Sequence, residues 1–301
     1  MKFLTFVLLT LILAGCQKKE ETPAEEASPS SENQMANSAT ESINGVLNST
    51  GLIAQIKPLK ENKNYVQILE RILLPHAHAA ACSAGGASVS ACSGSAPWVR
   101  TATYNCTLGA SAYTLSGTST LTYNTANCNT VINHSVIRTV NATISGPLGT
   151  LTTSSDSHAD YRGNTIGGGQ QFVKTGAAGA FTVLGMHRVL TGTKGRTLFD
   201  ISTRTTSDFT VTGSTLSDLT VDGGVLEIIH NLAQYTAQWM ATSVAWSSSC
   251  SCPVSGSLAG TFSGSVTGNM TVQFGPTCGA VTVTGTDGAT GTTTLDVCSS
   301  L

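Results

Sequence analysis

The sequence predicts a mainly β protein: an antiparallel sandwich or a large curved, partly closed sheet, with an N-terminal tether and one or two short α-helices. Two observations support this fold class. From about residue 98 onward, apolar residues alternate with small polar ones, which is the two-residue period of half-buried strands. No helical pattern of roughly 10–15 residues recurs between these runs, so antiparallel pairing is favoured over parallel crossovers.

The first residues have the pattern of a signal peptide. Met1 and Lys2 form a short basic start, and a mostly apolar run continues to Ala14. This run is shorter than the roughly 20 residues that cross a bilayer, and it has the length of a signal-peptide core. Residues 1–15 are therefore expected to be a cleaved export signal.

The apolar run ends in Leu13-Ala14-Gly15-Cys16, which resembles the lipobox of bacterial lipoproteins. The resemblance implies that diacylglycerol is attached to the Cys16 thiol, that the chain is cut before Cys16, and that the new amine is acylated. The residue that follows Cys16 is Gln17 and not an aspartate, which resembles the pattern of outer-membrane rather than inner-membrane lipoproteins. The resemblance thus implies a lipid-anchored outer-membrane protein that faces the periplasm or the cell surface. No cofactor other than this lipid is expected.

Two segments separate the anchor from the β region. Residues 16–40 are rich in Glu, Ser and Pro and have few large apolar side chains, so they are expected to be a disordered tether. Residues 41–75 contain apolar side chains at helical spacing, most regularly between Tyr65 and Leu73, and Pro75 ends the pattern. This helical segment is expected to pack on the β domain, residues 82–301.

The β domain is poor in charge. Residues 1–80 hold 15 of the 32 charged side chains, and the stretch from Ile228 to Thr286 holds none. Serine and threonine must therefore provide the water-facing side of the sheet. The net charge of −2 argues against nucleic acid as a partner, because such proteins present a basic surface.

Several runs alternate clearly enough to predict strands. In one of them, the alternate positions are occupied by Val136, Arg138, Val140, Ala142 and Ile144. Residues 225–246 are ambiguous, because part of their pattern also fits a helix. Their Tyr, Thr, Trp and Val content favours strands.

Glycine-containing pairs between alternating runs predict hairpin turns. Asp222-Gly223-Gly224 and Asp287-Gly288 each separate two such runs.

Nine cysteines leave eight for disulfides once Cys16 carries lipid, and an even number in an exported chain predicts up to four bonds. Segments 117–129 and 268–279 resemble each other, and an earlier cysteine precedes each of them. This repeat and proximity along the chain favour one set of pairs: Cys82–Cys92, Cys106–Cys128, Cys252–Cys278 and Cys250–Cys298. An oxidising compartment argues against a thiolate metal site.

Two polar clusters are weak candidates for chemistry. Asp156, His158 and Asp160 alternate along the chain, which would place them on one face of a strand as a cation site or an acid/base pair. His76 and His78 have the alternation of a metal-binding pair, but no third ligand has a clear spacing. A solvated loop and a linker are the competing interpretations.

No nucleophile elbow, zinc-protease motif or phosphate-binding loop occurs. The leading hypothesis is therefore a non-enzymatic, lipid-anchored envelope protein with a structural, adhesive or binding role. The sequence does not indicate whether its ligand is a protein, a glycan or a lipid. One alternative is a periplasmic carrier or assembly lipoprotein that holds an acyl chain in an apolar cleft of a curved sheet. The other is a hydrolase that uses Asp156, His158 and Asp160.

Overall fold

The structure is a computed structural model. It describes residues 82–108, 113–128, 133–147, 149–176, 178–213, 218–250 and 252–294. The predicted signal peptide, tether and helical segment lie outside these residues. No helix within the described ranges is long and apolar enough to cross a membrane.

The described chain is mainly β, as predicted. Its strands are β1 (Cys82–Val89), β2 (Trp98–Leu108), β3 (Tyr113–Tyr123), β4 (His134–Gly146), β5 (Gly149–Ser154), β6 (His158–Ala159), β7 (Thr165–Ile166), β8 (Gly169–Thr175), β9 (Ala178–Thr191), β10 (Thr197–Thr212), β11 (Thr220–His230), β12 (Tyr235–Trp246), β13 (Pro253–Gly264), β14 (Gly268–Phe274), β15 (Ala280–Thr284) and β16 (Thr290–Thr294). One 3-10 turn, η1 (Ala126–Cys128), follows β3.

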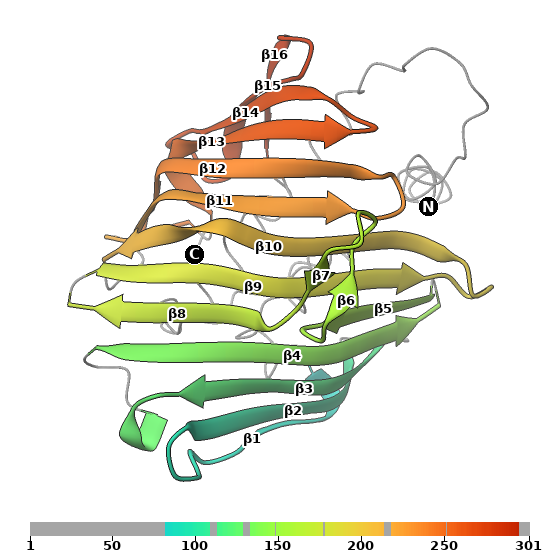
Figure 1. Ribbon diagram of the computed structural model, residues 1–301, viewed down its shortest axis with the longest axis vertical. Helices are drawn as coiled ribbons and strands as arrows, with labels where there is room; N and C mark the ends of the chain where they lie inside the picture. Colours follow the sequence, from blue (N-terminus) through green and yellow to red (C-terminus); the bar gives the residue numbers. More distant parts are fainter. Residues whose placement is uncertain are drawn as a thin grey trace.

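Fourteen of the described strands form one antiparallel sheet, in which almost every strand pairs with its neighbour in sequence. The order is β1-β2-β3-β4-β5-β9-β10-β11-β12-β13-β14-β15-β16, and β8 lies between β4 and β9 beside β5. Figure 1 shows this progression from β1 to β16 along the long axis, with the separate β6–β7 hairpin in front of the sheet. Of the predicted architectures, the large single sheet is the one observed.

Residues 225–246 form strands, as favoured from the sequence. β11 and β12 flank a turn at 231–234, where Gln234 has φ of +57° and its N–H donates to the His230 carbonyl at 2.8 Å. Leu226 and Ile229 would share one side of a helix, but in the strand they point to opposite faces. Both are fully buried.

One predicted turn is wrong and the other is confirmed. Gly223 and Gly224 lie inside β11 at a β-bulge, with φ values of +62° and +67°. A Cβ on Gly224 would lie 2.5 Å from the Phe209 ring, so the bulge needs glycine for space as well as for φ. The Asp-Gly signal is shared by bulges and turns, because both require positive φ. Asp287-Gly288 does form the turn between β15 and β16.

The two faces of the sheet differ in character. We name the face that carries Phe181, Leu226 and Trp239 the apolar face, and the opposite face, against which the β6–β7 hairpin lies, the polar face. Alternation along each strand separates them. The apolar face holds most of the core: Val140, Phe172, Phe181, Val183, Phe209, Val211, Leu226, Ile228, Trp239, Leu258, Phe262, Met270, Val272 and Val283.

Candidate functional site

The predicted cluster Asp156, His158 and Asp160 lies at the beginning of the β6–β7 hairpin, on the polar face of β9 to β12. The hairpin crosses in front of β9 and β10 (Figure 1). It lies so close to the sheet that a Cβ on Gly185 of β9 would be 2.2 Å from the Gly167 nitrogen. A glycine in β9 therefore permits this contact between two backbones.

Asp160 organises the hairpin itself. Its side chain is fully buried and accepts hydrogen bonds from the backbone N–H and guanidinium of Arg162 and from the backbone N–H and amide of Asn164, at 2.8–3.1 Å. Burial acts to raise the pKa of Asp160, but these hydrogen bonds outweigh it and lower the pKa to about 2. Asp160 is thus an ionised turn anchor, not a proton donor.

Arg162 joins the hairpin to the sheet. Its Nη1 and Nη2 donate to the two oxygens of Glu227 on β11 at 3.1 and 3.2 Å, and Arg204 Nε on β10 donates to Glu227 Oε2 at 2.6 Å. The Glu227 side chain is only 3% exposed. Burial acts to raise the pKa of Glu227, and the hydrogen bonds from both arginines reverse this and lower it. The buried carboxylate is therefore fully compensated.

His158 makes a second connection between hairpin and sheet. Its Nε2 lies 2.7 Å from Ser202 Oγ on β10, and its ring stacks on His187 of β9 with centroids 3.9 Å apart. His187 Nε2 lies 2.9 Å from Asp200 Oδ1, and the Asn231 amide donates to both Asp200 and Ser202. Burial lowers the pKa of His158, against an opposing hydrogen bond to the Asp156 carbonyl.

A serine hydroxyl at 2.7 Å from a histidine nitrogen is the geometry of an activated nucleophile. Two features oppose that role for Ser202. Ser202 is completely buried, so a substrate cannot reach it. Asp200, the available carboxylate, bonds to His187 and not to His158. The pair serves packing of the hairpin on the sheet.

The three predicted site residues do not converge. Asp156 is exposed and accepts from the Asn141 amide at 3.2 Å, Asp160 bonds within the hairpin, and His158 bonds to Ser202. The acid/base pair or cation site that the hydrolase hypothesis needs is not formed by these contacts. The reason is the length of β6, which contains only His158 and Ala159: Asp156 precedes it at a bend and Asp160 follows it, so the three residues do not occupy alternate positions of one strand.

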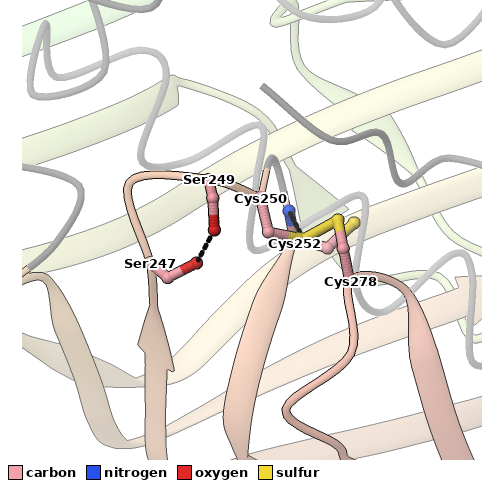
Figure 2. The surroundings of a disulfide bond; sticks show 5 residues. All are labelled: Ser247, Ser249, Cys250, Cys252 and Cys278. Carbon is pink, nitrogen blue, oxygen red and sulfur yellow. Dashed lines mark hydrogen bonds between the residues drawn. A yellow bond between two sulfur atoms is a disulfide. The ribbon is translucent and has the colours of Figure 1, made fainter.

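The cysteine pairing predicted from the sequence is wrong. Cys92 pairs with Cys128, and Cys250 with Cys278 (Figure 2). Cys106 and Cys252 are also disulfide-bonded. These bonds contradict all four predicted pairs, Cys82–Cys92, Cys106–Cys128, Cys252–Cys278 and Cys250–Cys298. The broader prediction, that disulfide bonds link parts of the β domain, is confirmed.

Strand register explains the correction. Trp98 of β2 lies opposite Tyr123 of β3, so Cys92 and Cys128, which lie just beyond these two residues, meet at one end of the hairpin. Cys106 lies eight residues further along β2, about 26 Å away at the usual rise per residue. The repeat in the sequence gives only the spacing of the cysteines along the chain. It does not show at which end of the hairpin each cysteine lies, so it led to the wrong pairing.

Register also brings Cys250 to Cys278, because β13 and β14 are antiparallel and the start of one lies beside the end of the other. Cys252 lies at the same end, and its backbone N–H donates to Cys250 Sγ at 3.4 Å (Figure 2). As predicted, the adjacent pair does not bond to each other.

The sequence did not single out the most unusual charge. Arg138 on β4 is 6% exposed and lies on the apolar face. A signal was present, because Arg138 occupies an inward position in the alternating run Val136 to Ile144. His76, His78 and Cys16 lie outside the described residues. Within the described part of the chain, no three His, Cys, Asp or Glu side chains form a metal site.

Comparison of the chain with models of protein families, with curated proteins and with solved structures finds no match.

Proposed function

We propose that this chain is a lipid-anchored protein of the bacterial cell envelope with a structural or binding role, and that the polar face of β1 to β5 is a surface that contacts its partner. The lipobox at Leu13 to Cys16 supports the anchor. The disulfides Cys92–Cys128 and Cys250–Cys278 support an oxidising compartment, because such bonds form and persist outside the cytosol.

A regular row of uncharged polar side chains supports the binding role most directly. Ser88, Thr103, Thr118, Asn141 and Ser154 lie directly opposite one another across five strands. All but Ser154 are exposed. Neighbouring members are about 4.8 Å apart, the spacing of strands in a sheet.

A second row runs parallel to the first, two residues along each strand. It contains Asn105, Ser116, Thr143 and Thr152. Together, the two rows form a grid of uncharged hydrogen-bond donors and acceptors, with the Asp156 carboxylate at its border beside Asn141. A neutral polymer rich in hydroxyl and amide groups, such as a cell-wall glycan, has the complementary chemistry.

The anchor is tested by labelling cells with radioactive palmitate. We expect the wild-type chain to be labelled and to sediment with outer membranes, and Cys16→Ala to lose both properties. Label retained by Cys16→Ala would overturn the anchor.

The binding surface is tested by co-sedimentation with insoluble cell-wall glycan. Thr103→Lys/Thr118→Lys places unpaired charge in the contact, so binding should weaken at least about tenfold. Thr271→Lys is the matched control, because Thr271 is exposed on β14, away from the rows. Equal binding by both variants, or no binding by the wild type, would contradict the proposal.

A further inference from the structure

The last strand of the described sheet has an open side. β16 (Thr290–Thr294) pairs with β15 alone among the described strands and lies at one end of the sheet (Figure 1). In an antiparallel pair, every second residue directs its N–H and C=O away from the partner strand. No residue that the structure describes bonds to these outward backbone groups of β16. The strand therefore offers a row of backbone donors and acceptors to an incoming strand.

β16 lacks the features that keep an edge strand unpaired, which are charged side chains, proline and bulges. It contains four threonines and one glycine, and its five pairs with β15 follow one another without a register shift. At the other edge of the sheet, the pairing of β1 with β2 is irregular between Cys82 and Ala84. Of the two edges, β16 is thus the regular one, and its threonines favour strand pairing.

The side chains of β16 are accessible to a partner. Thr290, Thr292 and Thr294 are exposed, and they share one side of the strand because they occupy alternate positions. An open hollow of about 290 Å³ lies at this edge and is lined by Gly275 and residues 280–282 and 292–294. The hollow gives room for side chains of a strand that is added here.

A second copy of this chain fits this edge. Two identical strands can pair antiparallel about a two-fold axis, so that the same patch is used on both copies. With the axis at Thr292, all five residues of β16 pair with a residue of the second copy, and Thr290 lies opposite Thr294. Threonines that lie opposite one another in neighbouring strands stabilise the pairing. Since β16 carries no charge, it has nothing with which to select a charged peptide instead.

The contact area of such a pair is small. Five residues from each copy bury less than the roughly 1,200–2,000 Å² of a stable interface, so the association should be weak when the copies diffuse freely. Copies that share one membrane plane meet at much higher effective concentration, and for tethered modules this concentration reaches the millimolar range. The lipid anchor of the proposed function would therefore strengthen the pairing.

We propose that β16 is a self-association edge, at which two copies of the chain join their β16 strands as an antiparallel pair and form one continuous sheet. The pairing itself depends on β16 alone. Only its strengthening at a membrane rests on the proposed lipid anchor.

The test is sedimentation equilibrium of the purified full chain in a density-matched non-ionic detergent, at protein concentrations up to about 1 mM. We expect a reversible equilibrium between monomer and dimer for the wild type. Thr290→Lys/Thr294→Lys places like charges opposite each other at two positions of the pair, so the dissociation constant should rise about tenfold. The matched variant Thr290→Lys/Thr294→Glu places opposite charges there and should dimerise at least as tightly as the wild type.

A wild-type chain that stays monomeric up to about 1 mM would overturn the proposal, as would equal dissociation constants for the two variants. Growth into open-ended oligomers would also contradict it, because pairing of β16 with β1 of the next copy leaves a free edge at each end. Both substituted threonines are exposed, so the variants should fold alike, and the wild-type titration stands without them. The measurement uses neither glycan nor palmitate, so this proposal and the proposed function can fail separately.

Discussion

The two faces of the sheet bury charge in opposite ways. On the polar face, Glu227 is almost completely buried and bonds to two arginines, one from the sheet and one from the hairpin. On the apolar face, Arg138 is similarly buried, and its hydrogen bonds to described residues go to Ser119 and Gln170. The first arrangement pairs opposite charges and connects the hairpin to the sheet. The second has no carboxylate partner among the described residues.

The largest effect is expected when the negative charge of Glu227 on the polar face is removed. Glu227→Gln removes the negative charge shared by Arg162 and Arg204 and replaces one of its two acceptor oxygens by an amide NH2. Breaking a buried ion pair costs about 3 kcal/mol. Urea unfolding should show a loss of this size. Asp222→Asn is the matched control, because Asp222 is exposed on the same strand and bonds to one backbone N–H. A loss no larger than that of the control would show that the network does not stabilise the fold.

The hairpin anchor predicts a specific acid sensitivity. Because the pKa of Asp160 is lowered to about 2 in the folded chain, its stabilising contribution is present above the unfolded pKa near 3.8 and is lost as the pH falls through about 2. The shift corresponds to about 2 kcal/mol. Wild type should lose this much stability between pH 5 and 2, measured by urea unfolding, and Asp160→Asn should lose less. Equal pH dependence in both would refute the role of Asp160.

Arg138, which has no carboxylate partner among the described residues, should behave in the reverse sense. Arg138→Met replaces a buried charge by an apolar side chain of similar length, so stability should be unchanged or raised by about 1 kcal/mol. A decrease similar to that of Glu227→Gln would mean that Arg138 is paired after all, and the contrast between the faces would disappear.

The smallest expected effect concerns His158. Burial lowers its pKa, so the folded hairpin favours the neutral ring; its contribution is present above the unfolded pKa near 6.5 and is lost as the pH falls. Hydrogen exchange of the Asp160 and Gly163 amides, corrected for intrinsic rates, should accelerate a few-fold from pH 7.5 to 5.5. His158→Phe keeps a ring against His187 and should show a weaker dependence. A pH response unchanged in this variant would assign the titration to another group.

Features of the fold that depend on residues close together in the sequence could be predicted, whereas contacts between residues far apart in the sequence could not. Alternation is local, so the strands, including β11 and β12, and the inward position of Arg138 were visible in the sequence. The Gly223-Gly224 bulge was mistaken for a turn because both need positive φ. The contacts of Glu227 with Arg162 and of Cys92 with Cys128 depend on strand register and on how the hairpin folds over the sheet. Neither property is encoded in spacing along the chain.

The sequential order of the strands has a consequence for how the molecule forms. Because nearly every strand pairs with the one made just before it, the chain can lengthen its sheet one edge at a time as it emerges, without waiting for distant partners. The exceptions are the β4–β8 and β5–β9 pairings, which can form only after the β6–β7 hairpin has been synthesised. The slowest step of assembly should therefore lie at the middle of the sheet, where the hairpin comes to rest, and not at either edge.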